Sequence, residues 1–133
     1  DSWRVRVVFF IKIQNTSSGT KKSLKFQITQ HSRDEQLIKS LVAYFGCGRY
    51  EVRSKDKKFS GGSAGDFIVT KYSDIADKII PFFYKYPIRG AKALDFSDFS
   101  AVAEKIKNKD HLTPEGLDRI RIIKAGMNKG RQW

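Results

Sequence analysis

The stretch that decides the fold is WRVRVVFFIKI at residues 3–13, with KKSLKFQITQH close behind at residues 21–31. In both, apolar and polar side chains alternate with a period of two, which is typical of a strand with one buried face. The intervening QNTSSGT, residues 14–20, predicts a seven-residue polar loop that contains a glycine. Two neighbouring strands joined in this way predict an antiparallel hairpin.

The rest of the chain predicts one helix, two more strands and then further helices. These elements are expected at residues 32–45, 49–55, 66–71, 73–86 and 92–107, and from Thr113 onward. Ser32 and Glu35 have the spacing of a capping box, Ser73 is expected to cap the next helix, and Pro81 is expected to kink it or end it early. The order ββαββ followed by helices predicts one α+β domain over residues 1–133, with helices on one face of a four-stranded antiparallel sheet.

The charge balance narrows the class of function. The chain has 26 Lys and Arg against 14 Asp and Glu, a formal net charge of +12. A domain this basic suits a polyanionic partner, of which nucleic acid is the commonest; a solvated surface and a membrane surface are the alternatives. No apolar run reaches the length of a membrane span. The positions of the charges have to decide between the three interpretations.

The positions of the cations support a nucleic-acid interface. They follow the strand period, so one side of the sheet is expected to be basic, with Glu51 as its acid. The residues expected on this side are Arg4, Arg6, Lys12, Lys21, Lys25, Gln27, Thr29, Arg49, Glu51, Arg53, Lys55 and Thr70. Antiparallel ribbons can enter a major groove, where Arg reads guanine, Gln reads adenine and Lys contacts phosphates. Sheet readers of RNA usually expose several aromatics, and here Phe10 is the clearest one.

Other kinds of site have little support. His31 and His111 lie far apart and Cys47 is a lone cysteine, so no zinc-binding pattern exists. Asp95 and Asp98 are three residues apart on a predicted helix and are expected to be solvated. The sequence has no glycine-rich phosphate loop of the nucleotide-binding kind.

Four separated motifs occur in an order that a known family shares. They are FQITQHSRDEQLIKSLVAYFGCG (26–48), DFIVTKYSDIADKIIPFF (66–83), YPIRGAKALDFSDF (86–99) and NKDHLTPEGLDRIRIIKAGMNKGR (108–131). From Trp3 to Arg131 the chain closely resembles LAGLIDADG homing endonucleases of the fungal mitochondrial, intron-encoded group. It looks most like the second half of a member with two motifs in one chain.

The resemblance implies a fold, partners and a location. Family members have a saddle-shaped antiparallel sheet that straddles the major groove of duplex DNA, and two halves pair through their motif helices. One acid from each motif helix binds a divalent metal, usually Mg²⁺, between the two scissile phosphates. The resemblance therefore implies a second half or other protein chain as partner and a mitochondrial location. It implies magnesium as cofactor only if the catalytic acids are complete, and otherwise no cofactor. Structured RNA is a second possible nucleic acid.

The family motif helix should precede the first strand, where this chain has Asp1-Ser2-Trp3. In one register Asp1 follows the acid, Arg4 faces DNA, and the catalytic acid is expected outside this chain or lost. In the other register Asp1 is itself the metal-binding catalytic acid, which would turn Arg4 toward the core. Burying an unpaired charge is costly, so the first register is preferred.

The resemblance also assigns individual roles. Gln30 matches a glutamine near the active centre, and Lys92 is the candidate for the basic residue near the scissile phosphate, with Arg89 as its rival. The positions that match groove-facing family residues are Gln27, Arg49, Glu51, Arg53, Asp66, Ile68 and Thr70. Two functions stay open: half of a site-specific endonuclease, or a cleavage-dead relict that binds RNA or DNA as an intron maturase or in a mitochondrial ribonucleoprotein such as the ribosome. The missing motif helix favours the second.

Overall fold

The computed structural model of the chain describes residues 5–30, 35–52 and 65–127, and these form a four-stranded sheet with helices. The strands are β1 (Val5–Thr16), β2 (Gly19–Gln30), β3 (Arg49–Val52) and β4 (Gly65–Val69). They are antiparallel and lie in the order β1-β2-β4-β3. The predicted α+β class and the predicted antiparallel sheet are therefore confirmed.

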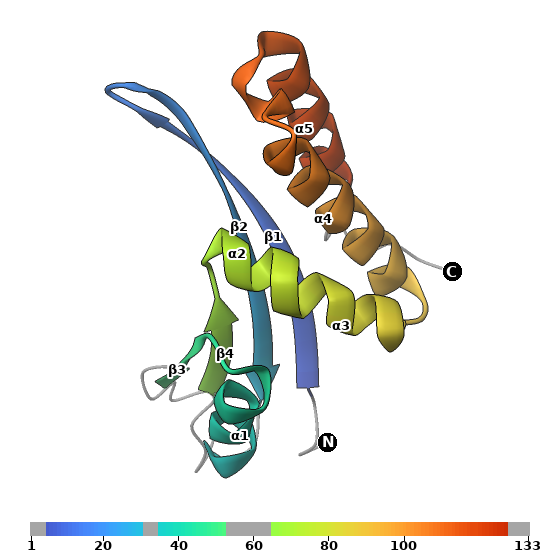
Figure 1. Cartoon of the computed structure of the whole chain (residues 1–133). Coiled ribbons are helices and arrows are strands. Elements are labelled where there is room, and N and C mark those ends of the chain that lie inside the picture. The colour runs from blue at the N-terminus through green and yellow to red at the C-terminus, as the bar shows by residue number, and fades with distance from the viewer. Residues whose placement is uncertain (1–4, 31–34, 53–64, 128–133) are drawn as a thin grey trace, which may run out of the picture.

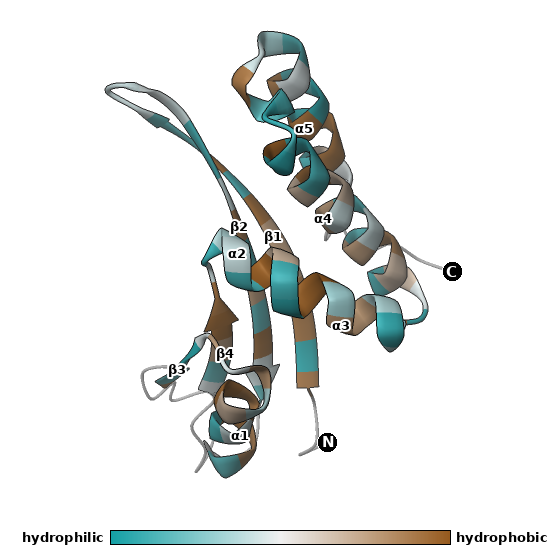
Figure 2. Ribbon diagram, viewed as in Figure 1, coloured by the Kyte–Doolittle hydropathy of each residue, from teal (hydrophilic) through white to brown (hydrophobic). Residues whose placement is uncertain are grey.

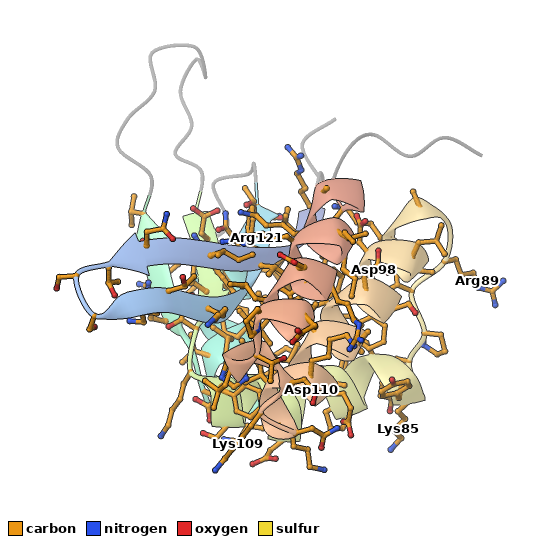
Figure 3. All side chains as sticks on the ribbon, turned by 90° about the horizontal axis from the view of Figure 1, so that it is seen from above. Lys85, Arg89, Asp98, Lys109, Asp110 and Arg121 are labelled. Atoms are coloured by element: carbon orange, nitrogen blue, oxygen red, sulfur yellow. The ribbon has the colours of Figure 1, made fainter. Side chains whose placement is uncertain are left out.

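The helices lie on one side of the sheet, and β1 and β2 curve so that their hairpin extends beyond the neighbouring helices (Figure 1). The helical elements are α1 (Glu35–Phe45), α2 (Tyr72–Asp74), the π-helical η1 (Ile75–Ile79), α3 (Ile80–Lys85), α4 (Ala91–Lys107), the 3₁₀ turn η2 (Asp110–Leu112) and α5 (Pro114–Gly126). In the view from above, the strands occupy one edge of the molecule and the helices the opposite edge (Figure 3).

The core lies between the sheet and these helices, and the strand period decides which side chains enter it. Along β1, the hydrophilic residues Arg6 and Lys12 flank a hydrophobic run from Val7 to Ile11 (Figure 2). Phe9 is fully buried, and four phenylalanine rings from β2, α3 and α4 lie 5.1–5.7 Å from its ring centroid. Tilted and edge-on aromatic contacts of this kind are favourable beyond the area they bury. Phe9 therefore packs the hairpin against both α3 and α4.

The hairpin turn is much tighter than predicted. Residues 14–16 and 19–20 continue the strands, and only Ser17 and Ser18 remain in the turn. Thr16 Oγ1 donates to the Gly19 carbonyl oxygen at 2.9 Å, and Gly19 has a φ of +134°, which favours glycine. The polarity of QNTSSGT was misread as a loop because an outer hairpin with both faces exposed needs no apolar residues.

The predicted helix at 73–86 exists, but its start and interior differ. Lys71, and not Ser73, occupies the N-cap position, and Ser73 lies within the first turn. Pro81 neither ends nor visibly breaks the run, because the turn before it widens to a π-helix in which Ile80 N–H bonds to the Ile75 carbonyl oxygen. Proline lacks an N–H, so a wider preceding turn accommodates it.

Two glycines after α1 set the start of β3. Gly46 ends α1 as predicted, with a φ of +66° and a hydrogen bond from its N–H to the Val42 carbonyl oxygen. Gly48 has a φ of +82°, and a Cβ there would lie 2.7 Å from a ring carbon of Phe67. The close approach of β3 to β4 therefore requires glycine at residue 48.

The remaining predictions about helix caps and strand ends are confirmed in part. Thr113 caps α5 as predicted and accepts a hydrogen bond from Gly116 N–H at 3.0 Å. Val52 is 56% exposed because it ends a short edge strand. Thr70 lies just after β4, and so outside the strand predicted to hold it. The Ser32 part of the capping box falls outside the described residues.

Candidate nucleic-acid interface

The face of the sheet that no described helix covers will be called the open face. It consists of alternate strand residues and comprises Arg6, Val8, Phe10, Lys12, Gln14, Lys21, Ser23, Lys25, Gln27, Thr29, Arg49, Glu51, Asp66 and Ile68. Strand pairing places these residues in rows across the sheet. One row runs Arg6, Thr29, Asp66, Glu51, and the next runs Val8, Gln27, Ile68, Arg49.

The open face has a charged rim and a recessed centre. Arg6, Lys12, Lys21 and Arg49 are exposed at its outer positions. The central residues are almost fully buried, at 7% exposure or less; they are Val8, Gln27, Thr29, Asp66 and Ile68. Exposed cations at the rim suit phosphates, and polar groups at the centre suit base edges.

Lys25 links the rim to the centre. Its ammonium lies 5.2 Å from the centroid of the Phe10 ring, a cation–π contact. Burial lowers the pKa of Lys25, as does nearby Lys12, while Glu51 and Asp66 raise it. Strand pairing places Lys25 on the same face as these groups, as the strand period predicted.

The centre holds a cluster of three polar side chains, Gln27, Thr29 and Asp66. Gln27 Nε2 donates to Thr29 Oγ1 at 3.1 Å and to Asp66 Oδ1 at 3.2 Å. The Thr29 hydroxyl donates to the same Asp66 oxygen at 2.7 Å. The strand pattern alone named Glu51 as the acid of this face, and it missed Asp66 because Asp66 seemed to be the first residue of its strand.

The predicted interface residues divide into three groups. The structure gathers Arg6, Lys12, Lys25, Gln27, Thr29, Arg49, Glu51, Asp66 and Ile68 on the open face. Arg4, Arg53 and Lys55 lie outside the described residues. Thr70 is exposed but follows the end of β4. Ile68 lies on the open face as predicted, but it is only 3% exposed. It therefore offers little surface for contact with a ligand.

The predicted catalytic residues come from separate elements. Asp1 lies outside the described residues. Gln30 ends β2 opposite Val5 and is 1% exposed. Lys92 lies in the first turn of α4, where its ammonium is 3.6 Å from Asp95 Oδ2. Arg89 precedes α4 and points away from the strands (Figure 3). The roles of Asp1, Gln30 and Lys92, with Arg89 as the rival of Lys92, stay predictions.

The prediction that Asp95 is solvated was wrong. Asp95 is 3% exposed and pairs with Lys92. The spacing of three residues between them on a helix was the signal that could have revealed the pair. A buried carboxylate beside Lys92 holds this ammonium in place.

Two general features of the described chain can be stated. Within residues 5–30, 35–52 and 65–127, no three or more His, Cys, Asp or Glu side chains are grouped so that they could hold a metal ion. Over the same residues, no helix has both the length and the apolar character that crossing a membrane requires.

Comparison with known proteins places this geometry in a family. A family model described as LAGLIDADG endonuclease matches residues 8–103. Probable intron-encoded endonuclease 2 of Neurospora crassa is 46% identical over 131 residues, which cover 91% of this chain and 27% of that protein. Probable intron-encoded endonuclease 3 of the same fungus is 33% identical over 117 residues, covering 86% and 21%. The chain thus spans about a quarter of the length of these curated relatives.

Solved structures of similar proteins contain DNA. The meganuclease I-SmaMI bound to uncleaveable DNA is 46% identical, with a TM-score of 0.82 over 94% of this chain and 42% of that chain. The I-LtrWI LAGLIDADG homing endonuclease bound to target DNA is 43% identical, with a TM-score of 0.82 over 95% and 41%. I-SmaMI has also been solved with uncleaved DNA in the presence of calcium ions. The chain belongs to the LAGLIDADG endonuclease family.

Proposed function

We propose that residues 1–133 form one half of a site-specific DNA endonuclease, with the open face lying along the major groove of duplex DNA. The observation that carries this proposal is the grouping of exposed cations from three strands on a face without helices. The DNA complexes of similar proteins support it. Because the curated relatives are intron-encoded endonucleases of a fungus, we also propose a mitochondrial location.

On this proposal the two zones of the open face have different tasks. Exposed Arg6, Lys12 and Lys21 contact phosphates along the hairpin, which fixes the position of the protein on the duplex. The recessed centre, with Gln27 and Asp66, faces base edges and supplies sequence preference. Affinity and specificity therefore come from different residues of the same strands.

Cleavage requires a second half and a divalent cation, for which we propose Mg²⁺. A bound cation lowers the pKa of its water and stabilises the attacking and leaving oxygens of an in-line displacement. In this proposal the metal centre is shared, and each half gives one acid to it. In this chain Asp1 is the candidate acid in one of its two registers. Lys92, fixed by Asp95, would place positive charge beside the scissile phosphate, and Gln30 would donate a hydrogen bond there.

A cleavage assay on duplex DNA tests this proposal. The full-length protein should cut a selected duplex in Mg²⁺ and leave it intact in EDTA, while still binding it. Lys92→Gln should lower the cleavage rate strongly and leave DNA affinity within a few-fold, whereas Lys85→Gln, on the helical side of the molecule (Figure 3), should change neither. Tighter binding to structured RNA than to any duplex DNA, without cleavage, would contradict the proposal.

A further inference from the structure

The central polar cluster of the open face has a fixed direction of hydrogen bonding. Asp66 has a carboxylate, which only accepts, so the Gln27 atom beside it must be the amide nitrogen. Thr29 gives its single hydroxyl hydrogen to Asp66, so its oxygen can only accept from Gln27. An inverted Gln27 amide would set its carbonyl oxygen against the lone pairs of both neighbours.

This direction leaves one kind of group for a ligand. The Gln27 amide nitrogen has two hydrogens, and the two bonds to Thr29 and Asp66 use both. The remaining polar atom of the side chain is the carbonyl oxygen Oε1, an acceptor. All three residues are at most 7% exposed, and hydrogen bonds shielded from water resist rearrangement. The amide is therefore pre-oriented before any DNA arrives.

We propose that Gln27 reads DNA only as a hydrogen-bond acceptor, and that it selects cytosine first and adenine second at one base-pair position. This inference rests on the proposed DNA-binding function. A glutamine with a free amide pairs with adenine by donating to N7 and accepting from N6. Here the donor is occupied, so Gln27 cannot make the donor half of that pair. The cytosine N4 amino group needs an acceptor alone, which Oε1 supplies.

The same geometry rejects the other two bases. Guanine presents N7 and O6 in the major groove and thymine presents O4, and all of these are acceptors that would face Oε1. The neighbours of Gln27 in its row, Val8 and Ile68, are apolar and offer no substitute donor. The sequence-based expectation was that Gln reads adenine. For Gln27 the inference changes this to cytosine first and adenine second.

Selection of binding sites from a randomised duplex library tests the inference. The full-length protein should enrich a consensus, and Gln27→Met should lose the preference at one base pair, where we infer that Gln27 contacts the amino-bearing base, cytosine of a C·G pair or adenine of an A·T pair. Binding of Gln27→Met to the wild-type site should be about tenfold weaker or more, the usual effect of one base contact. Gln14→Met is the matched control, because Gln14 lies on the outer part of the open face opposite Lys21. It should leave that position as in the wild type.

A second variant tests the direction of the amide. Asp66→Asn replaces an acceptor with a group that can donate to Gln27, which allows the amide to turn and present its nitrogen. The preferred base at the Gln27 position should then change toward guanine, thymine or bidentately bound adenine, while other positions keep their preferences. A purely structural role for Asp66 would instead weaken binding at every position alike, and that result would overturn the inference.

The remaining outcomes are distinguishable. The absence of any base pair that responds to Gln27→Met would overturn the inference alone. Because every pair contains either cytosine or adenine, base analogues at the responsive pair decide which atom is read: 7-deazaguanine in a C·G pair, or 7-deazaadenine in an A·T pair, removes the N7 acceptor. Unchanged binding supports acceptor-only reading, and a loss of about tenfold, typical of a lost base contact, overturns it. Failure of the wild-type protein to enrich any consensus would overturn the proposed function itself, and the inference with it.

Discussion

Salt dependence offers the most direct test of the open face. Three of its exposed cations, Arg6, Lys12 and Lys21, have no ion-pair partner among the described residues, whereas Arg49 pairs with Glu51 and Lys25 lies near two acids. Each phosphate contact contributes about −0.9 to the slope of log affinity against log salt. Three to five contacts therefore predict a slope of about −2.7 to −4.5.

The double variant Lys12→Gln/Lys21→Gln should make this slope shallower by about 1.8, because two phosphate contacts are removed. Its charge-matched control is Lys85→Gln/Lys109→Gln, whose side chains lie on the helical side, away from the strands (Figure 3). Fluorescence anisotropy of a labelled duplex, titrated at salt concentrations from about 50 to 200 mM, gives the slope for each protein. An equal change in the control, or a wild-type slope near zero, would refute the argument that the open face grips the DNA backbone.

Three further predictions concern stability and are checked by urea unfolding. Phe9→Ala should lower the free energy of unfolding by about 3–5 kcal/mol, as other truncations of buried aromatic residues do. Phe10→Ala, on the open face, should lower it by about 1 kcal/mol. Similar losses for the two variants would contradict the assignment of Phe9 and Phe10 to opposite faces. Gly48→Ala should destabilise more than Gly46→Ala, since both have positive φ but only at Gly48 would a Cβ lie 2.7 Å from a ring and 2.8 Å from a carbonyl oxygen. Thr113→Ala should lower the free energy of unfolding by about 1 kcal/mol because the α5 cap is lost. Thr113→Ser should keep most of this stability because serine also has a hydroxyl at the cap position.

Much of the fold could be predicted because hydrophobic burial imposes a period on the sequence. The alternation around Phe9 and Phe26 set the two faces of the hairpin, and Thr113-Pro114 marked the start of α5. The turn at Ser17 and Ser18 was missed because the hairpin tip buries little, so its composition carries no period. The wider turn before Pro81 was missed because helical spacing alone does not distinguish a π-turn from an α-turn.

The candidate site was predicted less completely, and for a different reason. Side-chain periodicity tells which face a residue occupies, so the cations of the open face could be grouped. It does not tell which residues on neighbouring strands lie opposite each other. Thr29 and Asp66 are 37 residues apart, and their contact depends on the pairing of β2 with β4. The pairing of Lys92 with Asp95 was missed because Asp95 was expected to be solvated.

The hydrogen-bonded cluster of Gln27, Thr29 and Asp66 has a consequence for attempts to redirect this protein to new target sites. Residues in one hydrogen-bond network give non-additive effects when mutated, whereas distant, independent positions combine almost additively. Rim residues such as Lys12 and Lys21 can therefore be randomised one at a time and the best choices merged. Gln27, Thr29 and Asp66 need to be randomised together. A different base preference at Gln27 requires that the hydrogen-bond donors and acceptors of its two partners change as well.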